Sequence, residues 1–546
     1  MNSTVVFIAL FVVALSDIAQ LRAAALIHAD PSNYRTLLTT LKAGDTLTLA
    51  PGTYPRLLIT GLNGTPSAWI TITGPDLGPP AVIIGATGSN TVEIFNSSYL
   101  AIENLRVDSR GIPGTAGISA RGHDENLTHH IRIEGNTLVG QNGGQQTTCI
   151  STKTPTWGWI IRYNQVLGAG AGLYLGESDG TQPFVNGLIE NNLIKDTIGY
   201  GMQIKDQKSI PGIPGMPTEP TSTIIRNNVF IKNDQPSPDG DRPNLLVGAF
   251  PATGAGSLNM YEIYGNLFLH NHREALFQGS GRISLHDNIF VDGAYTYPAV
   301  VLRKQNFPLK IALVYSNTMY TSGKGIFVGT RAQIDDAVVG NLVFGNIPIS
   351  GAIMRQSDNI VDSQENAARY VKSPSFALGS MDFYPLVGKC QGQPLDLSDF
   401  RTDVDYSVDF NYTPKVESKG AVVYRGALAG EGSNPGWELR AGVKAPTPPA
   451  PVRRATLMWL SPASGQAGSS VQVTVTGANF ATGATLAVGG PGVEVSNVKV
   501  ASSTEITATF TIAPGASTGV RGVTVSMPSG NSNVANFRIN TRRQKD

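Results

Sequence analysis

Charged side chains are scarce in this chain: Asp, Glu, Lys and Arg make up 15% of its 546 residues, against about a quarter in average proteins. The 41 basic and 40 acidic residues leave a net charge of +1, so no basic excess is available to bind a phosphate backbone. We therefore expect no nucleic-acid partner. A hydrophobic content of 41% is that of a globular protein, and the length corresponds to roughly three domains.

Cysteine is nearly absent, since Cys149 and Cys390 are the only two in the sequence. Two cysteines cannot build a disulfide-stapled small domain or a cysteine-based zinc site. They are 241 residues apart in the chain, and we expect both to be buried free thiols.

Long hydrophobic runs are also missing, so the sequence predicts no membrane-spanning segment once the N-terminal segment is removed. The apolar run 5–15 is too short to span a bilayer and is typical of a signal-peptide core. With Ala23, Ala24 and Ala25 as a cleavage site, it predicts a signal peptide over residues 1–25 and a secreted protein, extracellular or periplasmic. The alternative is a hydrophobic N-terminal helix packed on the domain.

The C-terminal part differs in composition from the rest. Residues 443–454 are rich in proline and lack a hydrophobic period, which indicates a semi-stiff linker. Beyond it, alternating runs such as 470–476 and 505–512 are separated by Gly- and Ser-rich turns, which predicts a small antiparallel β-sandwich. Residues 455–541 resemble the IPT/TIG class of immunoglobulin-like domains, which implies either a glycan- or partner-binding appendage or a stabilising spacer.

A short phrase recurs through the middle of the chain: an alternation of apolar and polar residues, then Asn, then an apolar triplet. The recurring asparagines are spaced by 22–38 residues and are Asn136, Asn164, Asn192, Asn228, Asn266, Asn288, Asn317 and Asn341. A unit of this length without helical periodicity cannot bury its own apolar face, so neighbouring units must stack. The pattern predicts an all-β, right-handed parallel β-helix with three strands per coil, in which Asn takes the left-handed turn and its amides stack.

The repeats and the opening run 41–75, which reads LKAGDTLTLAPGTYPRLLITGLNGTPSAWITITGP, resemble the pectate lyases and the family 6 polysaccharide lyases. The resemblance implies a β-helix domain over residues 26–442. Its N-terminal cap would cover about 26–60, with a short helix within 31–41, and its closing segment about 360–442. The resemblance also implies a secreted protein whose partner is a polysaccharide, and we expect a monomer.

Overlaying the repeats assigns side chains to faces, because strand residues alternate with a period of two. Two residues before each Asn, Glu134, Arg162, Glu190 and Arg226 form an alternating-charge ladder, which we interpret as structural and exposed. His286 occupies the same column and is expected to be a stacked surface histidine. Two residues after each Asn, the column is uniformly apolar and is predicted to be core.

The outward face of the third strand is the predicted groove, as the resemblance implies. One outward column is expected to hold Lys205, Val247, Gln278 and Arg303, and a second to hold Tyr174 and Gln203. Two long insertions, 207–222 and 232–243, flank this strand, and such loops are uncommon unless functional. The segment 270–273, with His272 and Arg273, is expected to enter the edge of the groove.

These residue types suit uronate elimination, which needs a neutralised carboxylate, a base and an acid. Lys205 is the candidate base, and Arg303 or Arg273 would contact the carboxylate or the leaving oxygen. Carboxylates are the ligands that Ca²⁺ prefers, so a possible Ca²⁺ is assigned to Glu177, Asp206 and Asp179. The candidate substrate-binding side chains are Tyr174, Gln203, Gln278, His272 and Arg273. The sequence thus favours a polysaccharide lyase.

Two other functions stay open. A glycoside hydrolase needs two carboxylates about 5–10 Å apart, and either Glu177 with Asp206 or Asp239 with Asp241 could supply them. A non-catalytic glycan-binding or surface protein would use the same groove without turnover.

Overall fold

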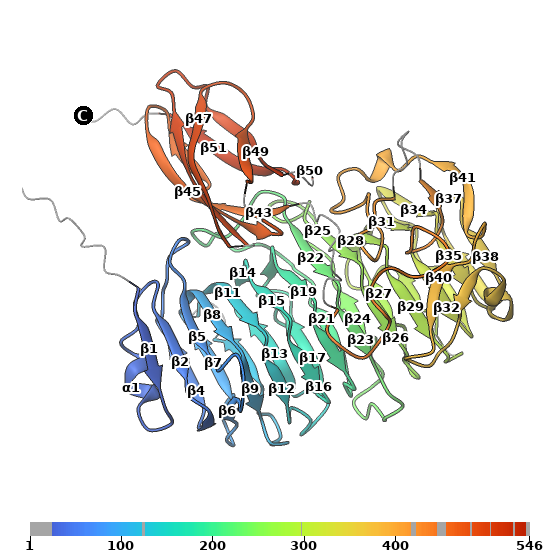
Figure 1. Ribbon diagram of the computed structural model, residues 1–546, viewed down its shortest axis with the longest axis horizontal. Helices are drawn as coiled ribbons and strands as arrows, with labels where there is room; N and C mark the ends of the chain where they lie inside the picture. The colour runs from blue at the N-terminus through green and yellow to red at the C-terminus, as the bar shows by residue number, and fades with distance from the viewer. Residues whose placement is uncertain are drawn as a thin grey trace, which may run out of the picture.

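The computed structural model describes residues 24–122, 126–295, 297–415, 422–444, 455–480, 483–502, 504–527 and 530–541. Residues 1–23 of the predicted signal peptide 1–25, and most of the predicted linker, lie outside these ranges. Within them, the chain forms a parallel β-helix followed by a β-sandwich, as Figure 1 shows. The predicted all-β fold is confirmed.

Each coil of the β-helix adds one strand to each of three parallel sheets, which we call A, B and C in chain order. Sheet A consists of β1 (Leu26–Ala29), β2 (Thr46–Leu49), β5 (Ile70–Thr73), β8 (Ser98–Glu103), β11 (Thr128–Glu134), β15 (Ile160–Arg162), β19 (Leu188–Glu190), β22 (Ser222–Arg226), β25 (Met260–Tyr264), β28 (Gly281–His286), β31 (Leu309–Tyr315), β34 (Asp335–Val339) and β37 (Arg355–Ser357), with β14 (Thr156–Trp157) and β18 (Phe184–Val185) extending it.

Sheet B consists of β3 (Gly52–Tyr54), β6 (Ala81–Ile84), β9 (Leu105–Asp108), β12 (Thr137–Val139), β16 (Gln165–Leu167), β20 (Leu193–Lys195), β23 (Val229–Ile231), β26 (Leu267–Leu269), β29 (Ile289–Asp292), β32 (Thr318–Thr321), β35 (Leu342–Phe344) and β38 (Ile360–Asp362). Sheet C consists of β4 (Leu57–Thr60), β7 (Val92–Phe95), β10 (Ile118–Arg121), β13 (Thr148–Lys153), β17 (Ala171–Leu175), β21 (Met202–Ile204), β24 (Leu245–Val247), β27 (Phe277–Gly279), β30 (Val300–Leu302), β33 (Lys324–Val328) and β36 (Ile347–Gly351).

The short helix α1 (Tyr34–Leu38) lies inside the range predicted for it and buries Tyr34 and Leu38 against the first coils. The described ranges also contain two 3-10 helices, η2 (Gln364–Arg369) and η3 (Ser398–Phe400). No helix in the described ranges is long and apolar enough to cross a membrane.

The asparagine amides stack at the corner between sheets A and B, and we call this stack the asparagine ladder. In a typical step, the Oδ1 of Asn192 accepts hydrogen bonds from the backbone N–H and the Nδ2 of Asn164, both at 3.0 Å. The Nδ2 of Asn192 donates to the backbone oxygen of Ile161 at 2.9 Å. All eight predicted asparagines take part, and Asn359 adds a further step beyond Asn341.

The backbone of this corner corrects one expectation. The left-handed residue is not the ladder asparagine but the residue before it, as at Asn191 (φ 55°), Asn227 (φ 56°) and Gly265 (φ 65°). The turn and the amide stack therefore occupy consecutive residues, because the side chain of the ladder asparagine must point into the coil to reach its neighbours.

The interior is apolar, as predicted. The column two residues after each ladder asparagine is fully buried, and its three phenylalanines, Phe230, Phe268 and Phe290, stack with ring centroids 4.9 and 4.7 Å apart. Cys149 and Cys390 are both buried and free, which confirms the expectation for them.

The charge ladder on the outer side of sheet A exists but is partly buried. Arg162 contacts Glu134 at 2.8 Å, and Arg226 contacts Glu190 at 2.8 Å. Arg226 is 0% exposed, so the expectation of an exposed ladder was wrong at this end. His286 stacks between Tyr264 and Tyr315 but is buried rather than at the surface.

The chain after the last coils, residues 397–415 and 422–444, covers the outer sides of sheets A and B, and we call it the strap. Two antiparallel strand pairs lie next to the strap. The pair β39 (Val371–Ser373) and β40 (Asp382–Pro385) precedes it, and in the other pair β41 (Gln391–Leu395) joins β42 (Val422–Tyr424) of the strap. Asp405 of the strap pairs with Arg226 at 3.3 Å, and Lys415 pairs with Asp287 at 2.8 Å. Outer-face charges of the β-helix are thereby buried with partners.

The C-terminal sandwich has two sheets, as predicted. One contains β43 (Thr456–Ser461), β45 (Ser470–Ala478), β48 (Glu505–Ile512) and β47 (Val493–Ser502). The other contains β44 (Ser464–Gln466), β51 (Ala535–Asn540), β49 (Gly519–Met527), β46 (Thr485–Val488) and β50 (Gly530–Asn531). Pairing is antiparallel except between β44 and β51.

The sandwich packs on the outer side of sheet A near its middle (Figure 1). Met458 and Trp459 of β43 contact the apolar side chains Ile160, Leu188 and Ile224. Trp459 also meets His130 edge to face, with ring centroids 4.5 Å apart. The β-helix and the sandwich thus share a hydrophobic contact.

The asparagine ladder generates a stability prediction. Asn228→Ala leaves the backbone N–H of Asn192 without the Oδ1 that it bonds at 3.0 Å, and an unpaired buried group costs about 1–3 kcal/mol. We expect the free energy of unfolding to fall by that amount, measured by denaturant titration. Asn233→Ala, in an exposed loop, is the matched control, and equal midpoints for the two variants would contradict the role of the ladder.

The contact with the sandwich generates a pH prediction. Burial lowers the pKa of His129 to about 4, and burial together with His129 lowers the pKa of His130 well below its usual value. Below about pH 6.5, His129 and His130 bind protons in the unfolded chain but not in the folded chain, where their pKa values are lower. We expect the free energy of unfolding to fall as the pH drops from 6.5 toward 4, by up to ~1.4 kcal/mol per pH unit and histidine. In parallel titrations, His129→Gln should reduce the dependence of the free energy of unfolding on pH. An unchanged dependence would contradict its assignment to His129.

Candidate functional site

The candidate site is the outward face of sheet C around β17, β21, β24, β27 and β30. Strand register places Tyr174 beside Gln203, then Leu246, then Gln278, then Val301. Tyr174, Gln203 and Gln278 therefore lie in one row, as stacked parallel strands require.

This register corrects the predicted columns. Val247 pairs with the buried Ile204, not with Lys205, and Gln278 belongs to the row of Gln203. Lys205 and Arg303 follow the last residues of β21 and β30, and both face outward, with Lys205 half-buried and Arg303 exposed. They are ~14 Å apart in strand spacing, because β24 and β27 lie between their strands.

One edge of this face carries two lysines around a tyrosine. The Nζ atoms of Lys153 and Lys205 lie 5.4 and 5.5 Å from the centroid of the Tyr174 ring. Lys153 also approaches Glu177 at 3.9 Å. Among the described residues, neither Lys205 nor Arg303 forms an ion pair within 4.0 Å; Lys205 lies over the Tyr174 ring, and the charge of Arg303 acts on Glu274.

The other edge holds residues that the sequence analysis missed. The guanidinium of Arg242 lies 5.5 Å from the ring centroid of Tyr200. Burial raises the pKa of the Tyr200 hydroxyl, and Arg242 and a hydrogen bond with Gln203 partly offset this effect. A protonated phenol thus lies beside the row of amides. Neither residue belongs to the repeating phrase, so no periodic signal marks them.

Glu274 is the other residue missed. Half-burial raises its pKa, while the N–H of Ala275, a hydrogen bond with Gln278 and the charge of Arg303 act against that rise. The backbone N–H of Ala275 donates to Glu274 Oε1 at 2.9 Å. A carboxyl with a raised pKa between a cation and an amide is typical of a group that transfers protons.

The predicted metal ligands are already engaged with the protein. Asp206 accepts the N–H of Ala249 at 2.7 Å on one oxygen and the amide of Asn306 at 2.8 Å on the other. Asp179 accepts both the N–H and the hydroxyl of Thr181 at 2.9 and 2.7 Å. Within the described ranges, no group of three or more His, Cys, Asp or Glu side chains is arranged to hold a metal ion.

The two remaining predicted residues lie at the border. His272 approaches Asp234 at 3.7 Å, and Arg273 approaches Asp241 at 3.8 Å. Both acidic partners belong to the insertion 232–243, which precedes β24 and hydrogen-bonds to Gln145, before β13 and three coils earlier, and thus borders this face.

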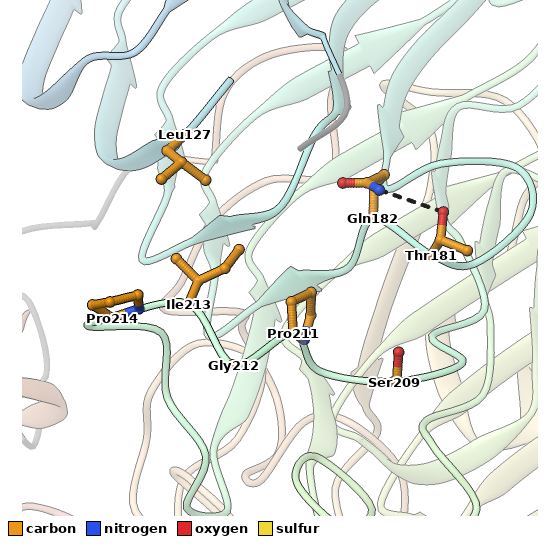
Figure 2. A pocket seen from close by; sticks show the side chains of 8 residues that line it. All are labelled: Leu127, Thr181, Gln182, Ser209, Pro211, Gly212, Ile213 and Pro214. Carbon is orange, nitrogen blue, oxygen red and sulfur yellow. Dashed lines mark hydrogen bonds between the residues drawn. The ribbon is translucent and has the colours of Figure 1, made fainter. Parts of the chain in front are cut away.

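The other insertion, residues 207–222, leads away from this face. Residues 210–216 of the loop 207–222 pack against Trp157 and Val185 on the side of sheet A. A cavity of about 440 Å³ lies between this loop and Leu127, Thr181 and Gln182 (Figure 2). The loop therefore leads from sheet C toward the C-terminal sandwich.

Comparison with known proteins identifies the family of the C-terminal domain. Residues 455–539 match the model of the IPT/TIG domain family. The chain is thus a parallel β-helix protein that carries an IPT/TIG domain. No curated protein matches it significantly.

Solved structures with a similar fold are distant in sequence. The alginate lyase AlyGC of polysaccharide lyase family 6 is 14% identical, with a TM-score of 0.36 over 62% of this chain and 51% of that one, so the chain spans about half of AlyGC. A mannuronic acid-specific family 6 lyase from human gut microbiota is 13% identical, with a TM-score of 0.36 over 63% of this chain and 84% of the other. The tailspike gp49 of the Acinetobacter baumannii bacteriophage Fri1, a capsular polysaccharide depolymerase, is 12% identical, with a TM-score of 0.29 over 92% and 86%.

Proposed function

We propose that this is a secreted, carbohydrate-active protein that binds an acidic polysaccharide across the outward face of sheet C and cleaves it by β-elimination. The observation that supports this most is the row Tyr174, Gln203 and Gln278, flanked by the basic side chains Lys205 and Arg303. An aromatic ring and amides suit sugar faces and hydroxyls, and cations suit uronate carboxylates.

The chemistry would take place around Tyr174. A uronate bound over its ring meets an amine on each side, from Lys153 and Lys205. The ammonium of Lys153 neutralises the carboxylate, which makes the proton on the adjacent carbon acidic. The amine of Lys205 takes that proton, the bond to the leaving oxygen breaks, a carbon–carbon double bond forms, and the resulting Lys205 ammonium or a water molecule protonates the leaving oxygen.

Because Lys205 and Arg303 are far apart, we assign different roles to them. Side chains ~14 Å apart serve different sugar units rather than one bond. We therefore assign Arg303, together with Gln278 and Arg242, to binding units further along the chain. Tyr200, protonated and next to Gln203, provides a further hydrogen-bond donor to the same chain.

Hydrolysis is the second candidate, because Glu274 supplies what a general acid requires. Its pKa is raised by half-burial, and the nearby charge of Asp241 raises it further. Glycoside hydrolysis uses a carboxyl with a raised pKa together with a second carboxylate. A binding protein without turnover is the third candidate, and the products distinguish all three.

The lyase proposal is tested on alginate, pectate and glycosaminoglycans by following absorbance at 232 nm. We expect unsaturated products from the wild type and a rate at least ~100-fold lower from Lys205→Ala, because a positioned base contributes about that factor. Lys195→Ala, on the outer side of sheet B, is the matched control and keeps full activity. Reducing ends without 232-nm absorbance would indicate hydrolysis instead, and retention on the polysaccharide without products would indicate binding alone.

The role of Ca²⁺ stays a prediction, which the same assay addresses. Because Asp206 and Asp179 already accept protein hydrogen bonds, we expect the 232-nm rate to withstand EDTA. A rate that EDTA abolishes and Ca²⁺ restores, in the wild type but not in Asp206→Asn, would instead assign a Ca²⁺ site to these carboxylates.

A further inference from the structure

The insertion 232–243 joins β23 to β24 and borders the candidate site on sheet C. Its middle is hydrogen-bonded to a loop three coils earlier. Gln145 accepts the backbone N–H of Asp239 at 2.8 Å and donates to the backbone oxygen of Gly240 at 2.6 Å. The insertion therefore lies along the edge of the β-helix and has partners there.

Lys232, the first residue of the insertion, is buried. Its Nζ donates to the backbone oxygen of Gly199 at 2.8 Å and to that of Arg242 at 3.1 Å. Gly199 precedes Tyr200 in the chain. One ammonium group thus fixes the backbone beside Tyr200 and at Arg242, and these are the two residues whose ring and guanidinium meet at the edge of sheet C.

Asn271 supports the same carbonyl group from the next coil, and it is also buried. Its Nδ2 donates to the backbone oxygen of Arg242 at 2.9 Å, and its Oδ1 accepts the backbone N–H of Glu274 at 3.0 Å. The carbonyl oxygen of Arg242 therefore accepts from both Lys232 and Asn271, which occupies its two lone pairs. We call Lys232, Asn271 and the carbonyl groups of Gly199 and Arg242 the anchor cluster.

The anchor cluster holds the three site residues that the repeat does not mark. Tyr200, Arg242 and Glu274 each lie in or beside backbone that the cluster contacts. All three lie in loops between strands of sheets B and C. The register of the sheets therefore does not fix their arrangement, and the hydrogen bonds of the cluster do.

A lysine is an unfavourable residue to bury at this place. Burial lowers the pKa of Lys232 to about 8. The carboxylates of Asp241 and Glu274 act against this fall, and the guanidinium groups of Arg242 and Arg273 add to it. Burial of an ammonium group costs free energy that burial of an apolar side chain of the same length does not. Ionisable groups in such surroundings are enriched at functional sites.

We propose that Lys232 is a positioning residue of the candidate site, which holds Arg242 against Tyr200 so that the guanidinium and the phenol meet an acidic chain bound along sheet C. The insertion is then a fixed wall of the binding face. Its side chains are arranged before the chain arrives, which favours binding because less has to be ordered. The role in binding rests on the proposed function, whereas the role in fixing the insertion does not.

The first test needs no ligand. It is hydrogen exchange of the full chain, followed by mass spectrometry of peptides within 233–243. Lys232→Met keeps the length of the side chain and removes the ammonium, so we expect exchange there to become about tenfold faster. Lys310→Met is the matched control, because its Nζ also donates to two backbone oxygens, those of Pro251 and Ala252, but from sheet A. Unchanged exchange in Lys232→Met would overturn the proposal.

The second test measures KM and kcat on the acidic polysaccharide that the wild type cleaves, or Kd if it binds without cleavage. We expect Lys232→Met to raise KM or Kd about tenfold and to leave kcat within about twofold, because Arg242 serves binding and not the bond that breaks. The double variant with Arg242→Ala should raise KM by less than the product of the two single effects, because Lys232 acts through Arg242. Independent, multiplying effects would overturn the proposal.

A conservative variant and a control complete the design. Lys232→Gln keeps a shorter donor and should give values between those of the wild type and Lys232→Met, and it replaces Lys232→Met if that variant does not fold. Lys310→Met should match the wild type in both tests. A wild type that neither binds nor cleaves alginate, pectate or glycosaminoglycans would overturn the proposed function and the role of Lys232 in binding, while hydrogen exchange still decides whether Lys232 fixes the insertion.

Discussion

The asparagine ladder is the interaction on which the rest of the structure depends. Each amide accepts two hydrogen bonds from the coil before it and donates one across the corner, so every coil is tied to the next at the same residue. This tie sets the register of all three sheets, because a slip of one residue would turn every side chain to the opposite face. The row Tyr174, Gln203 and Gln278 on sheet C is a consequence of that register, formed by strands far apart in sequence.

The strap imposes a second constraint, which acts through charge. Once sheet A is covered, its outer-face charges lose water and need partners, since an unpaired buried charge is strongly destabilising. Arg226 meets Glu190 and Asp405, and Asp287 meets Lys415. The same cover seats the IPT/TIG domain on sheet A, where Arg226 also donates to Thr456 at 3.4 Å. The C-terminal region is therefore built into the side of the β-helix.

The outward face of sheet C and the covered side of sheet A differ in their electrostatics. The outward face of sheet C keeps Arg303 in contact with water. On the covered side of sheet A, burial lowers the pKa of His129 to about 4 and raises the pKa of Glu262 well above its usual value. Water access explains the difference, because desolvation disfavours the charged form of every group it reaches.

Local sequence determined the coils, the core and the ladder, because each depends on a residue type recurring at one place in a repeat, as at Asn136 and Asn192. It also singled out Lys205 and Tyr174 as candidate site residues, because the repeat makes recognisable the strand that contains Tyr174 and the strand that ends before Lys205. The row of Gln278 was misplaced by one position, since loops of unequal length before β24 and β27 hide where each strand begins. Tyr200, Arg242 and Glu274 stand outside the repeat and carry no periodic signal. Only the tertiary structure could bury Arg226 or pack Trp459 on sheet A, because these contacts depend on a strap and a domain that are distant in the sequence.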